Sequence, residues 1–376
     1  MKEITILGST GSIGVQALDV ARRLNYKVYA LSSNRNVELI IAQAREFMPK
    51  MVCLGSREAA DEFMAKYPFD TKVVYSKEGL CEVASHKVDV LLNAVSGFCG
   101  LHPTIAAIEA GSDLALANKE SLVAAGDIIK GLAKEKGVSI RPVDSEHSAI
   151  WQCLQGENRS FVSKVILTAS GGPFRGRKDL ANITPKEALA HPNWSMGEKI
   201  SCDSATMMNK ALEVVEAARL FDLSSEEIDI IVHRESIVHS FVEFKDSSCK
   251  AQLSMPDMRI PIQLALTYPE RMEYKTKPLD LAKIASLTFE EPDYEVFPQV
   301  CYGHIALKMA GVVPCVMSAA NESAVDMFFR ERISFLDIPK LVKRAMDRCP
   351  NVINPSIDDI IEADRWAREF VLNGGC

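Results

Sequence analysis

The sequence predicts an α/β protein with three parts: a Rossmann-type N-terminal domain, an α/β central catalytic domain and a C-terminal helical bundle. Three observations lead to this prediction: a glycine-rich turn between the first strand and the first helix, an alternation of strand-like and helix-like runs up to residue 144, and four helical patterns near the end of the chain. Alternation of this kind is typical of a doubly wound, mostly parallel sheet.

Composition narrows the class of protein. The chain has 376 residues, of which 47% are hydrophobic, enough for two or three domains with proper cores. A net charge of -7 disfavours nucleic acid or an anionic membrane as the main partner. The ten cysteines are scattered in the manner of reduced cytosolic thiols, and no run of about 18 apolar residues or leading targeting peptide is seen. We therefore expect a cytoplasmic protein.

The opening segment carries the clearest motif. A short strand, residues 4–7, runs through Gly8-Ser-Thr-Gly11-Ser-Ile-Gly14 into a helix. Glycines at this point let backbone N–H groups approach a pyrophosphate at the helix N-terminus, and Ser9, Thr10 and Ser12 could add hydroxyl donors. The motif predicts a dinucleotide site, with a merely structural turn as the alternative.

The second strand, residues 26–31, predicts which dinucleotide binds. It is followed by Ser32-Ser33-Asn34-Arg35-Asn36, where an NAD site would normally place an Asp or Glu for the ribose 2′-hydroxyl. The guanidinium of Arg35 suits a 2′-phosphate instead, so we predict NADP. The alternative is an exposed loop arginine without a role.

The following elements bring charged residues to the ends of strands. Predicted strands cover residues 51–54, 72–75, 88–95, 113–117 and 139–143, and predicted helices cover 57–67, 77–84 and 102–110. Ligands of such sheets bind at the carboxyl ends of the strands. Lys119 follows one of these ends, so it is a candidate for the active site as well as for a surface lysine.

A D-x-E motif follows the last of these strands. Asp144 and Glu146 are two residues apart, and in an extended chain such positions point the same way. Two hard oxygen donors suit Mg²⁺ or Mn²⁺, and Ser145 between them is placed to face a substrate. An isolated D-x-E is more often a solvated loop, but Glu213 supplies a third carboxylate later in the chain.

The second domain is predicted to begin near Ser145. After a strand at residues 164–168, the turn Ser170-Gly171-Gly172 can present backbone N–H groups to an anion. The segment 191–197 places Trp194 and Met196 between a proline and a glycine, which indicates either a lid or a satellite core cluster.

Residues 201–218 predict one helix with a polar N-cap. Asn209, Lys210 and Glu213 share a face of this helix, opposite an apolar stripe. That polar face is either solvated or, with Ser204 at the helix start, a phosphate site next to a third metal ligand, Glu213.

The rest of the chain completes the predicted organisation. Strands at 228–232, 238–244 and 250–255 follow, the last two joined as a hairpin, and this sheet could pair with a second copy. Four helical patterns at 296–310, 315–330, 338–348 and 357–372 suggest a bundle. The predicted domains are an NADPH-binding Rossmann-like domain (1–144), a catalytic and dimerisation domain (145–268), a linker (269–294) and a four-helix domain (295–376).

Several strings of the sequence resemble a known family, the 1-deoxy-D-xylulose 5-phosphate reductoisomerases of non-mevalonate isoprenoid biosynthesis. The matching strings are Gly8-Ser-Thr-Gly-Ser-Ile-Gly14, Ala117-Asn-Lys-Glu-Ser121, Pro142-Val-Asp-Ser-Glu-His-Ser148, Ser170-Gly-Gly-Pro-Phe174, His191-Pro-Asn-Trp-Ser-Met-Gly197, Asp203-Ser-Ala-Thr-Met-Met-Asn-Lys210 and Ala319-Ala-Asn-Glu322. They occur in family order across nearly the whole chain. One departure is His233-Arg-Glu-Ser236, where the family usually has His-Pro-Gln-Ser, which puts the local backbone shape in question.

The resemblance implies a homodimeric enzyme that uses NADPH and a divalent metal, Mn²⁺, Mg²⁺ or Co²⁺, to convert its sugar phosphate into 2-C-methyl-D-erythritol 4-phosphate. It implies metal ligation by Asp144, Glu146 and Glu213. It assigns the substrate phosphate to Ser170, Ser204, Asn209 and Lys210, the sugar backbone to Ser145, Lys119 and His191, and the closing loop to Trp194 and Met196. The expected catalytic residues are Lys119, Glu146 and His191. The expected cofactor contacts are Thr10, Gly11, Ser12, Ile13, Ser33, Asn34, Arg35, Asn36, Asn118, Glu120 and Gly197.

Two other functions fit parts of the pattern. An NADP-dependent semialdehyde dehydrogenase would share the fold and use Cys202 as its nucleophile, but it has no use for three metal-binding carboxylates. A non-enzymatic NADP sensor would need neither the cysteine nor the carboxylates. For the skeletal rearrangement itself, a metal or a Schiff base on Lys119 or Lys210 could stabilise the charge, and three convergent carboxylates favour the metal.

Overall fold

The computed structural model describes residues 1–194, 196–274 and 276–375, so the prediction for Ser195 within the segment 191–197 lies outside the described residues. The chain divides into two compact units. The first unit comprises Met1–Ser121, Ile129–Ser145 and Asp257–Lys275, and the second comprises Leu122–Ile128, Glu146–Pro256 and Thr276–Cys376.

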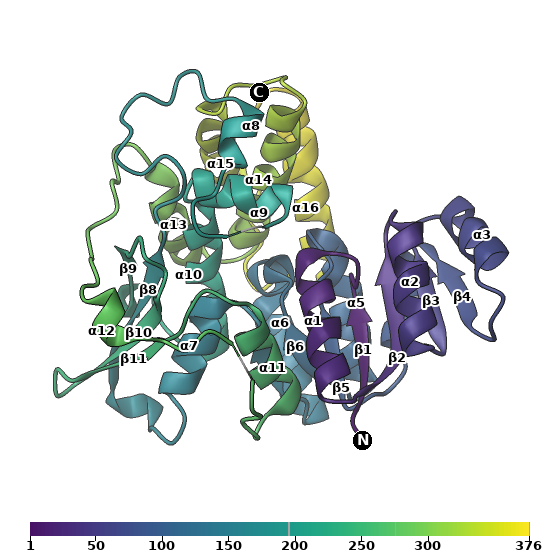
Figure 1. Ribbon diagram of the computed structural model, residues 1–376. Coiled ribbons are helices and arrows are strands. Elements are labelled where there is room, and N and C mark those ends of the chain that lie inside the picture. The colour runs from purple at the N-terminus through teal and green to yellow at the C-terminus, as the bar shows by residue number, and fades with distance from the viewer. Residues whose placement is uncertain (195, 275, 376) are drawn as a thin grey trace. The chain divides into compact units, whose positions relative to one another are not determined.

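The first unit is built on a seven-stranded sheet in the order β4-β3-β2-β1-β5-β6-β7, with every neighbouring pair parallel (Figure 1). The predicted Rossmann-type sheet is confirmed. Strand order reverses between β1 and β5, which is the position where such sheets bind their ligands. The strands are β1 (Glu3–Leu7), β2 (Lys27–Ser33), β3 (Met51–Leu54), β4 (Lys72–Tyr75), β5 (Val90–Asn93), β6 (Asp113–Leu116) and β7 (Ile140–Pro142).

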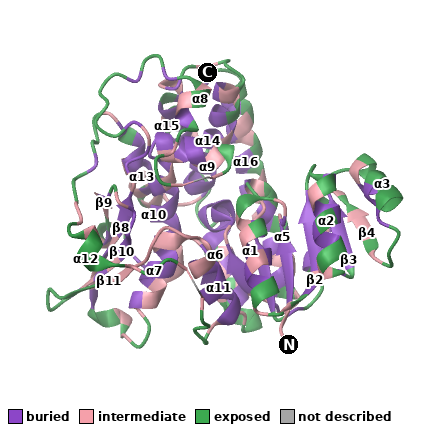
Figure 2. Cartoon of the chain, viewed as in Figure 1, coloured by how far each residue is buried: buried purple, intermediate pink, exposed green. Residues whose placement is uncertain are grey.

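Helices connect these strands, as the alternation in the sequence predicts. They are α1 (Ser12–Arg23), α2 (Val37–Phe47), α3 (Arg57–Lys66), α4 (Ser76–Ala84), the short η1 (Phe98–Gly100), α5 (Leu101–Glu109) and α6 (Lys119–Lys136). Buried residues concentrate in the strands, whereas the outer faces of α2 and α3 are exposed (Figure 2). The sheet therefore forms the core that holds the loops at its carboxyl edge.

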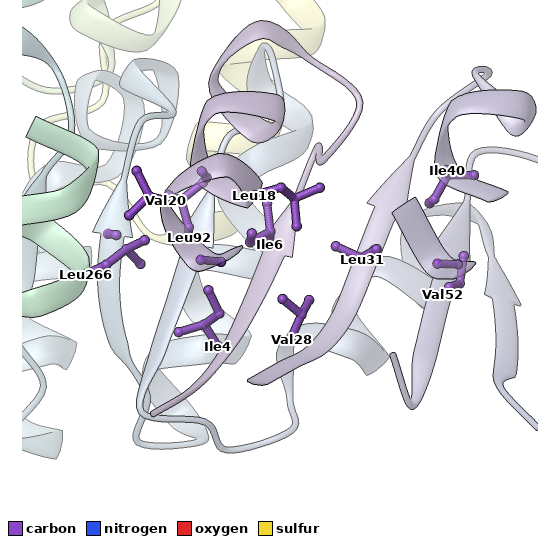
Figure 3. Packing of buried hydrophobic residues seen from close by; sticks show 14 of the residues in the cluster. Ile4, Ile6, Leu18, Val20, Val28, Leu31, Ile40, Val52, Leu92 and Leu266 are labelled. Carbon is purple, nitrogen blue, oxygen red and sulfur yellow. The ribbon is translucent and has the colours of Figure 1, made fainter. Parts of the chain in front are cut away.

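Helix α11 (Arg259–Thr267) was not foreseen from the sequence. Its residues Ile262, Ala265 and Leu266 are buried in the same core as Ile4, and Figure 3 shows Leu266 near Val20. The helix packs on α1, so a segment far along the chain completes the first unit. Short apolar runs do not reveal such a long-range partner, because local periodicity carries no information on what the apolar face will cover.

The second unit contains a four-stranded sheet in the order β11-β10-β8-β9. Strands β8 and β9 are parallel, whereas β10 is antiparallel to β8 and forms the predicted hairpin with β11. Helix α10 packs on this sheet through Val214 and Ala217, which share a core with Leu167 and Val242. The strands are β8 (Val162–Ala169), β9 (Ile228–Val232), β10 (Val238–Phe244) and β11 (Cys249–Leu253).

Two local predictions for this region are wrong. The predicted single helix is two helices, α9 (Glu198–Ala205) and α10 (Met208–Phe221), separated by Met207, whose φ of 63° is left-handed. Ser204 therefore lies in the last turn of α9 and not at a helix start. Glu146 lies in the first turn of α7 (Ser145–Cys153) and not in an extended chain. A left-handed methionine costs about 1–2 kcal/mol and leaves no trace in helix propensity, so the break could not be read from the sequence.

The four predicted C-terminal helical patterns are confirmed as helices. A short η4 (Pro298–Cys301) leads into α13 (Tyr302–Met309), followed by α14 (Val313–Phe329), α15 (Asp337–Arg348) and α16 (Ile357–Leu372), and α14 packs on the other three helices. The remaining short elements are η2 (Arg159–Phe161), α8 (Pro185–Ala188), η3 (Ser225–Glu227) and α12 (Leu281–Ile284). The four-part domain division stays a prediction. No helix in the described residues is long and apolar enough to span a membrane.

Candidate active site

The glycine turn of the first unit is shaped by two glycines in particular. Gly8 has a φ of +78°, and a Cβ placed on it would lie 2.6 Å from the carbonyl oxygen of Ala94. A Cβ on Gly14 would lie 2.2 Å from the carbonyl oxygen of Gly8, so α1 could not approach the turn. Gly11 is the N-cap of α1 and provides no side-chain cap, which leaves the N–H groups of Ser12 and Ile13 at an exposed helix N-terminus that suits an anion.

Ser9 does not act as the sequence suggested. Its hydroxyl is buried, 2.7 Å from Oε1 of Gln43 and 3.1 Å from the carbonyl oxygen of Ser32, so it stabilises the turn from within and cannot meet a pyrophosphate. Thr10 is half-buried, and its hydroxyl lies 2.8 Å from that of Ser33 at the end of β2. The glycine turn and the end of β2 are thereby joined.

The loop after β2 presents Arg35 to solvent. Asn36 caps α2 by accepting a hydrogen bond from the Leu39 N–H at 3.1 Å, and Asn34 packs so closely on Gly55 that a Cβ there would lie 1.9 Å from its Oδ1. The neighbours of Arg35 thus fix the loop. No hydrogen bond or ion pair of the Arg35 side chain is seen among the described residues, and an exposed guanidinium of this kind can meet a 2′-phosphate.

Asn118 organises the next strand ends. Its Nδ2 donates to the carbonyl oxygens of Val95 at 2.7 Å and Gly97 at 2.9 Å, and its Oδ1 accepts from the N–H of Ser121 at 3.0 Å as the N-cap of α6. Its Nδ2 also lies 3.1 Å from Oε2 of Glu120. The buried Asn118 amide is therefore occupied within the protein, and any cofactor contact here would come from the backbone that it holds.

Lys119 and Asp144 form an ion pair in the first unit. The Lys119 ammonium bonds to Oδ2 of Asp144, and the two side chains are only 8% and 14% exposed. The pair joins the start of α6 to the residue that follows β7 by two positions. Two neighbouring parallel strands, β6 and β7, thus deliver a cation and an anion to the same edge of the sheet, as their spacing predicted.

The carboxylates that could hold one metal ion are Asp144, Glu146 and Glu213. Glu146 and Glu213 belong to the second unit and present oxygens within 4.8 Å of each other. Asp144 precedes Glu146 by two residues, so the chain itself keeps the third carboxylate nearby. Three oxygen donors of this kind fit a hard divalent ion such as Mg²⁺ or Mn²⁺.

Lys210 lies between two of these carboxylates. Its ammonium donates to Oε1 of Glu146 at 2.7 Å, to Oε2 of Glu213 at 2.5 Å and to the carbonyl oxygen of Thr168 at 2.6 Å. The Nδ2 of Asn209 donates to the other oxygen of Glu213, while Oδ1 of Asn209 is buried without a hydrogen-bond partner in the described part of the chain. Glu213 is fully buried, so its charge depends on these donors.

The predicted phosphate residues gather around the loop after β8. A Cβ on Gly172 would lie 2.4 Å from the carbonyl oxygen of Ser204, so the double-glycine loop packs directly on the end of α9. Ser170 lies two residues before Gly172, and Lys210 bonds to Thr168 just upstream. Although Ser204 is not at a helix start, the structure brings it to this loop.

His191 forms a hydrogen bond to Ser170 in the same loop. Its Nδ1 accepts the N–H groups of Asn193 at 3.1 Å and Trp194 at 3.0 Å, so the proton of the neutral ring lies on Nε2, which donates to the hydroxyl of Ser170 at 3.0 Å. Burial and the nearby Lys210 charge lower the pKa of His191. The hydroxyl of Ser170 also accepts the N–H of Gly172, so its own hydrogen remains for a ligand.

The loop is anchored by a residue that sequence reasoning missed. Nδ2 of Asn193 donates to the carbonyl oxygen of Arg234 at 2.6 Å and to the hydroxyl of Ser236 at 2.9 Å. This turn is the place where the chain departs from the usual family string. Glu235 holds the turn by accepting a hydrogen bond from the Thr288 hydroxyl at 2.7 Å. The spacing of residues in the sequence does not link Asn193 to a turn 41 residues away. Only the family resemblance drew attention to the two segments, 191–197 and 233–236.

Of the other predicted residues, Trp194 and Met196 are half-buried and Gly197 is the exposed N-cap of α9. Cys202 is completely buried in α9, and burial raises the pKa of its thiol. A thiol without solvent access cannot act as the nucleophile of a semialdehyde dehydrogenase. The alternative function of a semialdehyde dehydrogenase therefore lacks its nucleophile.

A dinucleotide-type sheet and carboxylates suited to a divalent ion define a metal-dependent oxidoreductase. Sequence profiles described as 1-deoxy-D-xylulose 5-phosphate reductoisomerase match residues 4–126, and its C-terminal domains match 140–221 and 253–370. The chain belongs to the 1-deoxy-D-xylulose 5-phosphate reductoisomerase family.

Individual relatives agree over the full length. The reductoisomerase of Acetivibrio thermocellus is 53% identical over 375 residues, covering 99% of this chain and 98% of the relative, and that of a Geobacillus species is 51% identical over 377 residues, covering 99% of each. A solved structure of the Zymomonas mobilis enzyme in complex with NADPH is 41% identical with a TM-score of 0.91, covering 98% of this chain and 97% of that one. A second, described as DOX-P reductoisomerase with NADPH, fosmidomycin and magnesium, is 38% identical with a TM-score of 0.94, covering 99% and 98%.

Proposed function

We infer that the chain is a 1-deoxy-D-xylulose 5-phosphate reductoisomerase, an NADPH-dependent oxidoreductase that rearranges its ketose phosphate and reduces the product to 2-C-methyl-D-erythritol 4-phosphate. Family membership over the whole chain supports the activity. The main structural evidence for this activity is the carboxylate set Asp144, Glu146 and Glu213, which an ordinary dehydrogenase would not need. The NADPH-binding residues are those of the glycine turn and the Arg35 loop.

The substrate phosphate is assigned to the loop after β8. Ser170 offers a hydroxyl hydrogen that His191 orients, Gly172 lies beside Ser204, and Asn209 and Lys210 begin α10 next to this loop. A phosphate dianion prefers such a cluster of hydroxyl, amide and ammonium donors. Neutral His191 contributes by holding Ser170 in one orientation.

The metal is assigned to Asp144, Glu146 and Glu213, with Ser145 next to the sugar. When bound, a divalent ion supplies Lewis-acid stabilisation of the oxygens that become anionic while the carbon–carbon bond breaks and re-forms. Lys119 lies beside Asp144 and contributes a fixed positive charge. Trp194, whose N–H bonds to His191, is assigned to the loop that covers the bound substrate and excludes water.

The lysines serve as cations and not as Schiff-base nucleophiles. Lys119 is paired with Asp144, and Lys210 with Glu146 and Glu213, so neither amine presents a lone pair to a carbonyl. Borohydride added during turnover should therefore trap no substrate on either lysine. A covalent adduct at Lys119 or Lys210 in the mass spectrum would assign that lysine a nucleophilic role.

The activity is tested with purified protein, 1-deoxy-D-xylulose 5-phosphate, NADPH and Mn²⁺, by following NADPH absorbance. NADPH should be consumed only with the sugar phosphate and the metal present, and a chelator should stop the reaction. Glu213→Gln should abolish turnover, whereas Glu243→Gln, in strand β10 of the same unit, should leave it unchanged. Turnover that survives both the chelator and Glu213→Gln would argue against the proposed function.

We also propose a homodimer in the cytoplasm. Strand β11 ends its sheet, and no other described strand pairs with its outer side, so a second copy could extend the sheet there. The described cysteines are free thiols, which suits a reducing compartment. Sedimentation equilibrium with a β11 proline substitution such as Ala251→Pro tests the dimer.

A further inference from the structure

We propose that Lys210 is a resident counter-ion that holds Glu146 and Glu213 together until a divalent metal replaces it, and that the released ammonium then binds the substrate phosphate. This inference rests on the proposed function, because it uses the metal and phosphate sites assigned there. It adds an order of events: the metal prepares the phosphate site by freeing Lys210.

The N–H donors of Lys210 are all in use within the protein. An ammonium has three N–H donors, and those of Lys210 have acceptors at 2.7 Å on Glu146, 2.5 Å on Glu213 and 2.6 Å on Thr168. In this arrangement no donor remains for a phosphate oxygen. The two roles of Lys210, at the carboxylates and at the phosphate, therefore exclude each other and must alternate.

Lys210 and its two carboxylate partners are largely buried. The side chains of Lys210 and Glu146 are 6% and 16% exposed, and that of Glu213 is fully buried. Two carboxylates this close repel each other unless a cation lies between them, and removing one partner of a buried ion pair is costly. The ammonium thus offsets the repulsion between the two carboxylates in the metal-free protein, as the ion does in the metal-bound protein.

Lys210 and a divalent ion compete for the same carboxylate oxygens. A divalent ion that takes Glu146 and Glu213 removes two acceptors of Lys210 and repels its charge. Thr168, an acceptor that the ion leaves in place, lies at the end of β8, two residues before Ser170. The shortest move open to the ammonium keeps it at the end of β8, next to the loop that we assign to the phosphate.

A further observation fits this path. The charge of Lys210 contributes to lowering the pKa of His191, the residue that orients the Ser170 hydroxyl. The ammonium is therefore already close enough to influence the phosphate loop while it is bound to the carboxylates. By linkage, metal and phosphate monoester should each tighten the binding of the other.

The test measures the chemical accessibility of Lys210 in the full-length protein. The protein is treated with isotopically labelled formaldehyde and a mild hydride reagent, with and without saturating Mg²⁺ and without substrate, and methylation of each lysine is quantified by mass spectrometry. Mg²⁺ should raise the labelling rate of Lys210 by about ten-fold or more, since three charged hydrogen bonds protect it otherwise. Lys199, which is paired with Asp203 at 2.8 Å in the same unit, is the internal control and should not change.

A second measurement uses metal affinity. Mn²⁺ binding is followed by the electron paramagnetic resonance signal of the free ion in wild type, Lys210→Met and Lys199→Met. Removing the competitor should tighten Mn²⁺ binding about five-fold or more in Lys210→Met and leave it unchanged in Lys199→Met. If Lys210→Met does not fold, the labelling experiment decides alone.

The outcomes separate the inference from the function on which it rests. If Mn²⁺ binds but Lys210 stays protected, or if Lys210→Met weakens Mn²⁺ binding, the exchange is refuted and the lysine is a fixed part of the site. If Mn²⁺ does not bind wild type, or binds equally well to Glu213→Gln, the proposed metal site itself is wrong.

Discussion

Asn193→Ala should uncouple the His191 loop from the turn that anchors it. The Asn193 amide makes two hydrogen bonds, 2.6 Å to the carbonyl oxygen of Arg234 and 2.9 Å to the hydroxyl of Ser236. Each is worth about 0.5–1.5 kcal/mol, so their loss amounts to about 1–3 kcal/mol. Because Asn193 is exposed, we expect the lower half of this range, about 1–2 kcal/mol, which corresponds to a roughly five- to thirty-fold fall in kcat/KM.

We expect Asn193→Ala to lower kcat/KM through its effect on His191. Backbone N–H groups of Asn193 and Trp194 bond to Nδ1 of His191, whose Nε2 in turn orients Ser170. A free loop would therefore weaken phosphate binding, so KM for the sugar phosphate should rise more than kcat falls. The assay is steady-state NADPH oxidation, combined with thermal unfolding to show that the fold is intact.

A matched control is Asn158→Ala. Asn158 is another exposed asparagine of the second unit, and its side chain caps only η2. It should leave kcat/KM unchanged. If Asn193→Ala leaves kcat/KM unchanged, as Asn158→Ala should, Asn193 does not anchor the loop. The same conclusion follows if a fall in the melting temperature accounts for the whole loss of activity.

Three further results are expected. Arg35→Ala should weaken NADPH about ten- to a hundred-fold and NADH hardly at all, as the loss of one charged hydrogen bond of about 1.5–3 kcal/mol implies, and equal losses would show that Arg35 does not read the 2′-phosphate. Because the pKa of His191 is lowered in the folded protein, the unfolded chain takes up the proton first as pH falls from about 6.5. Loop anchoring should hold above the folded pKa and be lost below it, giving an acid limb in kcat/KM that disappears in His191→Gln. Cys202→Ala should stay fully active, and its inactivation would revive the thiol mechanism.

Much of the first unit could be predicted because its signals are local. Strand β1, the glycine turn and helix α1, which begins at Ser12, follow one another directly in the sequence, and the buried strands of a parallel sheet read as apolar runs. Arg35 was predicted to bind the 2′-phosphate because no Asp or Glu follows β2. The hidden part was α11, because its burial depends on a partner at the other end of the sequence.

The candidate site was predicted less evenly. Residue types and spacing suggested that Asp144, Glu146 and Glu213 act together, although Glu146 turned out to be helical. The left-handed Met207 that splits the predicted helix could not be foreseen, since no glycine marks it. Contacts such as Asn193 with Arg234 join segments through a backbone oxygen, and a backbone oxygen has no sequence signature.

The most direct test of the central claim is the carbon skeleton of the product. Substrate labelled with ¹³C at the two carbons that flank the bond to be broken is incubated with the protein, NADPH and Mn²⁺, and the product is examined by ¹³C nuclear magnetic resonance. A reductoisomerase must yield branched 2-C-methyl-D-erythritol 4-phosphate, in which the two labelled carbons are both attached to the branched carbon and no longer to each other, so the one-bond coupling between them is lost. A product that keeps the straight chain of the substrate, reduced only at its ketone, would contradict the account, because NADPH would then be consumed without any rearrangement.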